Sequence, residues 1–176
     1  MKRIEDAFQA VAAGVASGSV ERIDAAEKAA VDGFFSLWKA RSDWRLAEGG
    51  VVPLNGVRGD DLSQEQQENL ERNGYAFMRK DGMPKRFFHG LRIQMEIRAY
   101  QTQLSNISWG VIRASAGQFV VPDYPAYMFI PITPTICLYP GTGRGSVTRE
   151  NLADINAAQR AGSRGYFFAQ DLSQCP

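Results

Sequence analysis

The fold is decided by residues 109–121, WGVIRASAGQFVV, in the C-terminal half of the chain. Two short apolar runs, rich in β-branched and aromatic residues, flank the tripeptide Ser115-Ala116-Gly117. Runs of this composition are typical of strands, and a glycine-containing tripeptide between them is typical of a turn. The stretch therefore predicts a β-hairpin made of residues 109–113 and 118–121.

Further strands are expected downstream of this hairpin. Apolar runs occupy residues 127–130 and 135–139, with prolines between them, and a last run occupies residues 166–169. A helical pattern fills residues 148–162 before that last run. Short strands at this spacing favour a small antiparallel sheet.

Upstream of the strands, the apolar period is helical. Apolar residues recur every three or four positions over residues 2–16 and again over about residues 20–44, which predicts two helices. Residues 46–62 are rich in glycine and proline and predict a loop. Residues 63–72 open with a Ser-x-x-Gln capping box and end before Asn73-Gly74, as a short helix does.

Residues 84–104 predict a longer helix with apolar residues on two opposite faces. One face holds Phe87, Phe88, Leu91 and Met95, and the other holds Ile93, Ile97, Tyr100 and Leu104. A helix of this kind is expected to lie between two layers, with Leu91 and Ile97 both in the core. The expected fold is therefore α+β, one domain over residues 1–176. It has a helical part (1–45) and an α+β part (60–170) in which the central helix packs on the sheet.

Composition limits the classes of function. The chain has 44% hydrophobic and 22% charged residues, as globular proteins do. The net charge of +1, from 20 basic and 19 acidic residues, disfavours a strongly electrostatic nucleic-acid binder, although a local basic patch is compatible with one. The N-terminus does not resemble a secretory signal, and no apolar run approaches the length of about 18 residues that spans a membrane. We therefore expect a cytoplasmic protein without a membrane-bound part.

Few groups are suited to metal or nucleophilic chemistry. His89 is the single histidine, and Cys137 and Cys175 lie far apart without neighbouring ligands. Cys137 lies in an apolar run typical of a buried thiol, and Cys175 is expected to be a loose thiol near the end. We expect neither a metal nor a cofactor, and any catalytic triad would have to use His89.

Arg98, Asp123 and His89 are the candidate catalytic residues. Arg98 falls on an apolar face of the predicted helix and therefore needs a carboxylate or carbonyl partner. Asp123 lies next to Pro122 and close to Pro125, which restrict the backbone around it. An Arg98–Asp123 pair would satisfy both side chains, as a structural ion pair or as part of a functional pocket. A solvated helix-surface residue is the alternative interpretation of His89.

Two further sets of residues are candidate binding sites. Gly143, Arg144 and Gly145 lie in a glycine-rich segment before a predicted helix, where main-chain N–H groups can bind an anion; a plain connector is the alternative. The four cations near the start of the central helix form a local basic patch for a protein partner or nucleic acid, or else a solvated face. They are Lys80, Lys85, Arg86 and Arg92.

Several segments carry a family resemblance: Trp109, residues 118–125 (QFVVPDYP), residues 130–134 (IPITP), and the stretch from Asn156 to the YFFA run at 166–169. Through them the chain resembles an uncharacterised bacterial family, domain of unknown function four-two-three-eight, over roughly residues 60–170. The family has Phe-Ile-Thr-Ser-Asp-Asn-Pro and Pro-Leu-Ser-Pro patterns at the first two segments, so Tyr124 replaces an asparagine. The family's early His-Tyr-Val-Pro-Gln segment is absent. The resemblance implies an α+β fold and a bacterial or mobile-element origin, and it implies no reaction.

Three functions are compatible with these features. The leading hypothesis is a non-enzymatic protein-binding module of bacterial or phage origin, with an accessory, inhibitor or antidefence role. The second is a toxin-like or defence-associated hydrolase or nuclease centred on Asp123. The third is a binder of small anionic ligands or nucleotides that uses Arg144. The sequence specifies no oligomeric state.

Overall fold

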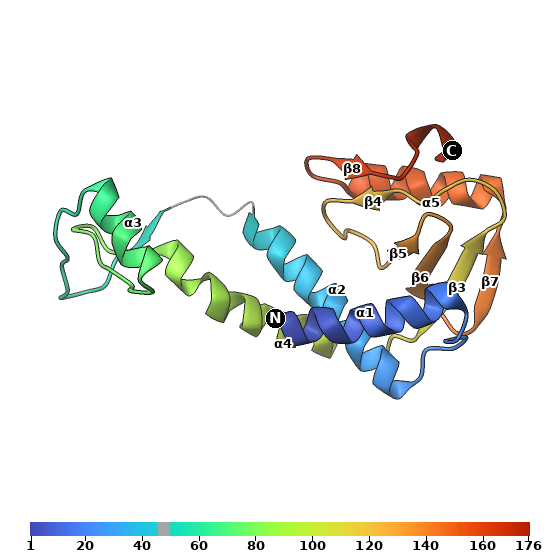
Figure 1. Cartoon of the computed structure of the whole chain (residues 1–176), viewed down its shortest axis with the longest axis horizontal. Coiled ribbons are helices and arrows are strands. Elements are labelled where there is room, and N and C mark those ends of the chain that lie inside the picture. Colours follow the sequence, from blue (N-terminus) through green and yellow to red (C-terminus); the bar gives the residue numbers. More distant parts are fainter. Residues whose placement is uncertain (46–49) are drawn as a thin grey trace. The chain divides into compact units, whose positions relative to one another are not determined.

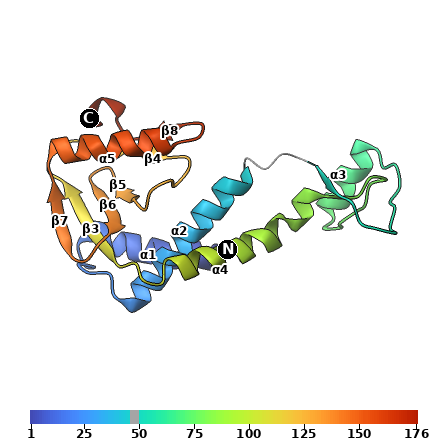
Figure 2. The ribbon, with the colours of Figure 1, turned by 180° about the vertical axis from the view of Figure 1, so that it is seen from behind.

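The structure is a computed structural model that describes residues 1–45 and 50–176. Figures 1 and 2 show helices together with small sheets, which confirms the predicted α+β class. The chain forms two compact units, one of residues 1–43 with 96–176 and the other of residues 44–95. We call them the sheet unit and the small unit and describe each by itself. Within the described residues, no helix is long and apolar enough to cross a lipid bilayer.

The sheet unit begins with two helices. α1 (Lys2–Ser17) confirms the first predicted helix and ends at Gly18, whose φ of 82° lies in the left-handed region that suits glycine. α2 (Ala25–Arg45) begins later than the predicted start near residue 20. The Asp24 carboxylate accepts the N–H groups of Ala26 and Glu27 at 2.8 and 2.9 Å, and the Glu27 carboxylate accepts the Asp24 N–H at 2.7 Å. This reciprocal capping box fixes the start of α2.

A sheet of four strands follows in the order β5-β6-β3-β7. Its strands are β3 (Trp109–Ala114), β5 (Ile130–Thr133), β6 (Ile136–Pro140) and β7 (Arg144–Val147). β3 is antiparallel to β6 and parallel to β7, so this sheet is mixed and not antiparallel throughout as predicted. The predicted strand at 135–139 is confirmed as β6, whereas the predicted strand at 127–130 shares only Ile130 with β5, which runs on through Pro131 to Thr133.

The predicted hairpin of residues 109–113 and 118–121 is wrong. Gly117 turns the chain with a φ of 90°, but the segment after it leaves the sheet. The Phe119 N–H donates to the Pro134 carbonyl at 2.8 Å, and β4 (Val121–Pro122) pairs with β8 (Phe167–Phe168) as a separate two-stranded ribbon. β3 pairs instead with strands that come later in the chain, because an apolar run specifies burial but not the partner strand.

Both faces of the four-stranded sheet are covered. Figures 1 and 2 show α1 on one side of it and α5 (Arg149–Gly162) on the other. Trp109 and Val111 of β3 join the core that α1 and α2 form, whereas Ile112 packs with Leu152 of α5. The alternation of side chains along β3 thus places successive residues in two separate cores.

Asp32 and Asn156 are two of the polar side chains that are buried in these layers. Asp32 of α2 accepts the indole N–H of Trp109 at 2.7 Å and pairs with Lys28, which donates to the Leu104 carbonyl at 3.0 Å. Asn156 of α5 is fully buried and accepts the Val120 N–H at 3.0 Å. These bonds satisfy groups that would otherwise be buried without a partner.

The small unit is built around one helix and a short ribbon. β1 (Val51–Val52) pairs with β2 (Met83–Pro84), and α3 (Gln64–Arg72) lies between them in sequence. The predicted capping box is confirmed, because Ser63 and Gln66 each accept the other's N–H. The first residues of the predicted 46–62 loop, 46–49, lie outside the described residues.

The predicted two-faced helix over residues 84–104 is wrong. A 3₁₀ turn, η1 (Lys85–Phe88), precedes α4 (His89–Gln103), and only one face of α4 is buried. Ile93 and Ile97 are 9% and 6% exposed, whereas Leu91 is 60% exposed. Apolar residues on both sides of a helical wheel do not by themselves require a second covering layer, and among the described residues none covers the Leu91 side.

Candidate functional site

Three consecutive aromatic residues at the end of the sheet unit are exposed. Tyr166, Phe167 and Phe168 have exposed fractions of 49%, 38% and 54%. We call them the aromatic strip. Aromatic side chains of this size usually lie in a core, so an exposed run of them is a candidate binding surface.

The ribbon that carries the strip leaves one strand edge open. β8 pairs only with β4 among the described strands. The Asp123 N–H donates to the Tyr166 carbonyl at 3.0 Å, and Pro122 lies opposite Phe167. Hydrogen-bonded and non-hydrogen-bonded pairs alternate in an antiparallel ladder, so the N–H and carbonyl of Phe167 point away from β4. These main-chain groups are available to a further strand.

A cluster of charged and phenolic side chains lies beside this ribbon. Lys39 donates to the hydroxyl of Tyr124 at 2.6 Å, and the guanidinium of Arg164 lies 3.4 Å from the centre of the Tyr124 ring. Arg164 also pairs with Asp43 at 3.0 Å, and Tyr100 donates to the same carboxylate at 2.9 Å. We call these five residues the tyrosine cluster. They come from four separate parts of the chain.

Within the tyrosine cluster, most of the charges are matched. Asp43 lies between Arg164 and the Tyr100 hydroxyl. Burial, and then the hydrogen bond to Asp43, raise the pKa of Tyr100, so Tyr100 stays protonated and acts as a donor. Lys39 is different, because it makes no ion pair with any described residue.

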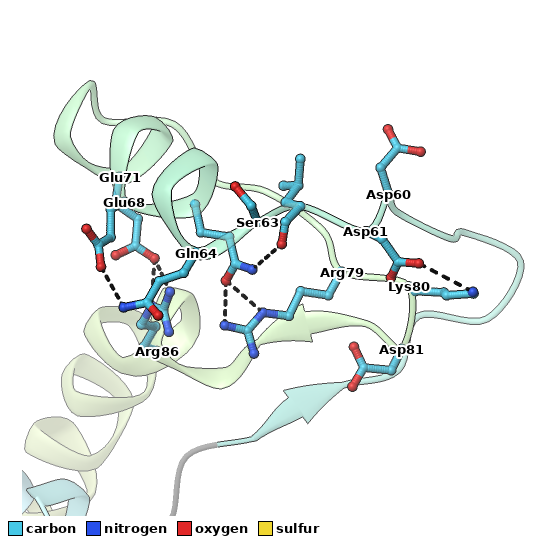
Figure 3. A pocket seen from close by; sticks show the side chains of 12 residues that line it. Asp60, Asp61, Ser63, Gln64, Glu68, Glu71, Arg79, Lys80, Asp81 and Arg86 are labelled. Carbon is cyan, nitrogen blue, oxygen red and sulfur yellow. Dashed lines mark hydrogen bonds and ion pairs between the residues drawn. The ribbon is translucent and has the colours of Figure 1, made fainter.

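The small unit has a polar hollow of about 1150 Å³, drawn in Figure 3. Its lining comes from α3 and the segment before it and from residues 79–81 and 86. The lining carries five carboxylates and three cations. Lys80 pairs with Asp61 at 3.5 Å, Arg86 pairs with Glu71, and Arg79 donates to Gln67 at 2.6 Å.

The four cations of the predicted basic patch do not form a free positive surface. Lys80 and Arg86 line the hollow and have carboxylate partners there. Lys85 is exposed and lies against Gly50. Arg92 lies over the Trp44 ring at 4.7 Å. Their partner-binding role stays a prediction, but this pairing lowers the positive potential that a nucleic acid would need.

His89 packs against the ring of Trp44, with 5.3 Å between ring centres. Among the described residues, no group of three histidine, cysteine, aspartate or glutamate side chains could hold a metal ion. Cys137 and Cys175 are both free and buried, which confirms the first thiol prediction and corrects the second, since Cys175 is only 8% exposed. Burial raises the pKa of each thiol, so neither suits a nucleophile.

The predicted pair of Arg98 and Asp123 is not formed. Arg98 is exposed. The Asp123 carboxylate accepts the main-chain N–H of Arg164 at 2.9 Å, and its carbonyl accepts the Ser42 hydroxyl at 3.1 Å. Asp123 therefore ties the start of the 164–168 segment to β4, and this contact places both the strip and Tyr124.

Replacing Asp123 with alanine should lower the free energy of unfolding by about 1–3 kcal/mol, because the Arg164 N–H loses its acceptor. Asparagine keeps an acceptor oxygen at this position, so Asp123→Asn should lose much less. Thermal melts of both variants beside the wild type measure the difference. If Asp123→Ala melted like the wild type, the structural role would be refuted and the hydrolase hypothesis centred on Asp123 would gain.

The glycine-rich candidate site lies partly in a strand. Arg144 and Gly145 belong to β7, and the Gly143 carbonyl accepts the Val111 N–H at 3.0 Å. Arg144 pairs with Glu21 at 2.8 Å. Pairing with β3 and this ion pair occupy groups that an anion would need, so the connector interpretation fits the geometry better.

The tyrosine cluster was missed at the sequence level. Lys39 and Asp43 are one helical turn apart on α2, and a polar pair at that spacing on a mostly apolar helix was the available signal. Nothing in the sequence connects that pair with Tyr124 or Arg164, because the contacts depend on the tertiary fold.

Comparisons with known proteins gave no relative: no family model, curated protein or solved structure matches the chain. The resemblance to domain of unknown function four-two-three-eight therefore stays a prediction.

Proposed function

We propose that this chain is a non-enzymatic protein-binding module that binds its partner through the aromatic strip. The observation that carries the proposal is the exposure of Phe167 and Phe168 on adjacent positions of a ribbon edge. Exposed aromatic residues of this kind are the usual anchors of a protein interface. A bacterial or phage origin, a cytoplasmic location and an accessory, inhibitor or antidefence role belong to the same proposal and rest on the sequence.

The ribbon geometry supports a particular mode of binding. An extended segment that adds to β8 would hydrogen-bond the outward N–H and carbonyl of Phe167. The side chains of neighbouring strand residues point to opposite faces, so Phe167 and Phe168 would contact the segment from both sides of the ribbon. Tyr166 precedes these two residues, and Tyr124 follows Asp123, whose N–H donates to the Tyr166 carbonyl.

The hydrolase and anion-binding alternatives have weaker support. Asp123 has a main-chain partner that accounts for its position, and Arg144 is paired with Glu21. Neither residue lines the polar hollow.

Replacing both phenylalanines with serine (Phe167→Ser/Phe168→Ser) should abolish selective peptide binding. A displayed library of random peptides panned against the wild-type chain should enrich sequences with adjacent apolar residues. The double variant should bind those peptides at least tenfold more weakly, because truncating an interface anchor costs about 1–2 kcal/mol or more. Both side chains are exposed, so the melting temperature should change little.

The matched control is Leu91→Ser/Met95→Ser, which removes two apolar side chains that are 60% and 64% exposed in the small unit. This control should bind the enriched peptides like the wild type. Equal binding by the strip variant, or an equal loss in the control, would refute the strip as the binding surface.

A further inference from the structure

Lys39 and Tyr124 present hydrogen-bond donors that have no acceptor among the described residues. The Lys39 ammonium donates one hydrogen to the Tyr124 hydroxyl oxygen at 2.6 Å. An ammonium has three hydrogens, and no described residue accepts the others. The Tyr124 oxygen is already the acceptor of that bond, so its own hydrogen also points elsewhere.

The neighbouring carboxylates, Asp43 and Asp123, do not accept a hydrogen bond from the Lys39 ammonium. The Asp43 carboxylate pairs with Arg164 and accepts the Tyr100 hydroxyl. The carboxylate of Asp123 accepts a main-chain N–H instead of Lys39. The Lys39 Nζ also lies 4.5 Å from the centre of the Tyr124 ring and 5.5 Å from that of the Tyr100 ring. These ring faces attract the cation but carry no net charge, so within the described part of the chain the half-buried ammonium has no counter-charge, and a partly buried cation without one is costly.

An oxyanion completes this arrangement. A carboxylate has two oxygens and accepts several hydrogen bonds, so it can bind the ammonium and the phenol hydroxyl together. Position then indicates its source. Tyr124 follows Asp123, whose N–H bonds to the carbonyl of Tyr166, so the donors lie at the border of the aromatic strip.

We infer that Lys39 and Tyr124 form a carboxylate-binding site that holds an aspartate or glutamate of the segment bound at the aromatic strip. This inference rests on the proposed function and specifies the partner: an extended segment with an acidic residue next to apolar ones. The strip supplies apolar contact and the two donors supply charge selectivity.

Peptide selection tests the partner's chemistry. Peptides enriched on the wild type should combine apolar residues with an aspartate or glutamate at a fixed spacing. Panning on Lys39→Met should still enrich apolar peptides but without the acidic residue. Enriched acidic peptides should bind Lys39→Met about tenfold more weakly than the wild type at low salt, and Tyr124→Phe should give a smaller loss. Lys2→Met, which removes an exposed lysine at the start of α1, should change nothing.

The two proposals fail differently in this experiment. Apolar enrichment without an acidic bias, unchanged by Lys39→Met, would refute the carboxylate site and leave the strip intact. If panning on the wild type enriched no peptides, the aromatic strip would be refuted as the binding surface. The carboxylate site is then tested without any peptide, by titrating sodium acetate into the isotopically labelled full-length chain.

Acetate should shift the side-chain NMR signals of Lys39 and Tyr124, and Lys39→Met should remove the Tyr124 shift. Inorganic phosphate is the comparison probe. If neither ion shifted these signals, or if phosphate shifted them at a much lower concentration than acetate, the assignment of a carboxylate would be overturned.

Discussion

Replacing Asp32 with alanine should lower the free energy of unfolding by about 3–5 kcal/mol, because it leaves a partly buried cation without its partner. The Asp32 carboxylate is 12% exposed and pairs with Lys28, which is 25% exposed. The same carboxylate accepts the indole N–H of Trp109, which is 3% exposed. The substitution therefore leaves two donors, the Lys28 ammonium and the Trp109 indole N–H, without their acceptor.

Urea denaturation followed by tryptophan fluorescence measures this loss. Asp32→Asn keeps an acceptor for Trp109 and should lose less than the alanine variant. Glu21→Gln breaks an exposed ion pair with Arg144 and should cost at most about 1 kcal/mol. A loss in Asp32→Ala no larger than in Glu21→Gln would contradict the role given to the buried carboxylate.

Replacing Leu138 with alanine should cost about 2–5 kcal/mol, whereas Leu91→Ala should change stability by no more than about 0.5 kcal/mol. Leu138 lies on β6 and is fully buried, and Leu91 is 60% exposed. The two substitutions remove the same atoms, so most of their difference reflects burial, with a smaller part from the lower propensity of alanine for strands than for helices. Far-ultraviolet circular dichroism during urea unfolding gives both values.

The Leu91 result decides between two accounts of α4. The sequence predicts a helix covered on two faces, and the structure has one covered face. A cost for Leu91→Ala near that of Leu138→Ala would show that the exposed face is covered in solution.

Elements defined by local interactions were predictable. The Ser63–Gln66 capping box, the helix at 2–16 and the helix at 148–162 all depend on residues within one or two turns of each other. Local signals were also misjudged: α2 begins at the capping box of Asp24 and Glu27, a signal of the same type that was present in the sequence.

Strand pairing was not predictable to the same degree. The run at 109–113 has the composition of a strand wherever it pairs, and its true neighbours are β6 and β7. Long-range pairing depends on which strands bury complementary faces, and residues 109–121 carry no information about that.

The candidate site shows the same limit. The run at 166–169 was predicted as a strand, and its composition gives no indication that its aromatic side chains are exposed. The tyrosine cluster joins α2, α4 and two loops, so its members become neighbours only in the folded sheet unit. Asp123 was identified as unusual from its prolines, but its partner is a main-chain N–H, which any residue at position 164 other than proline would supply.

Chemical-shift mapping tests the central claim most directly. A peptide enriched on the wild type is titrated into the full-length labelled chain, and main-chain amide signals are followed. The account predicts that the signals that move belong to Val121, Asp123, Tyr124 and residues 166–168. Movement confined to residues 60–86, around the polar hollow, with the aromatic strip unchanged, would contradict it.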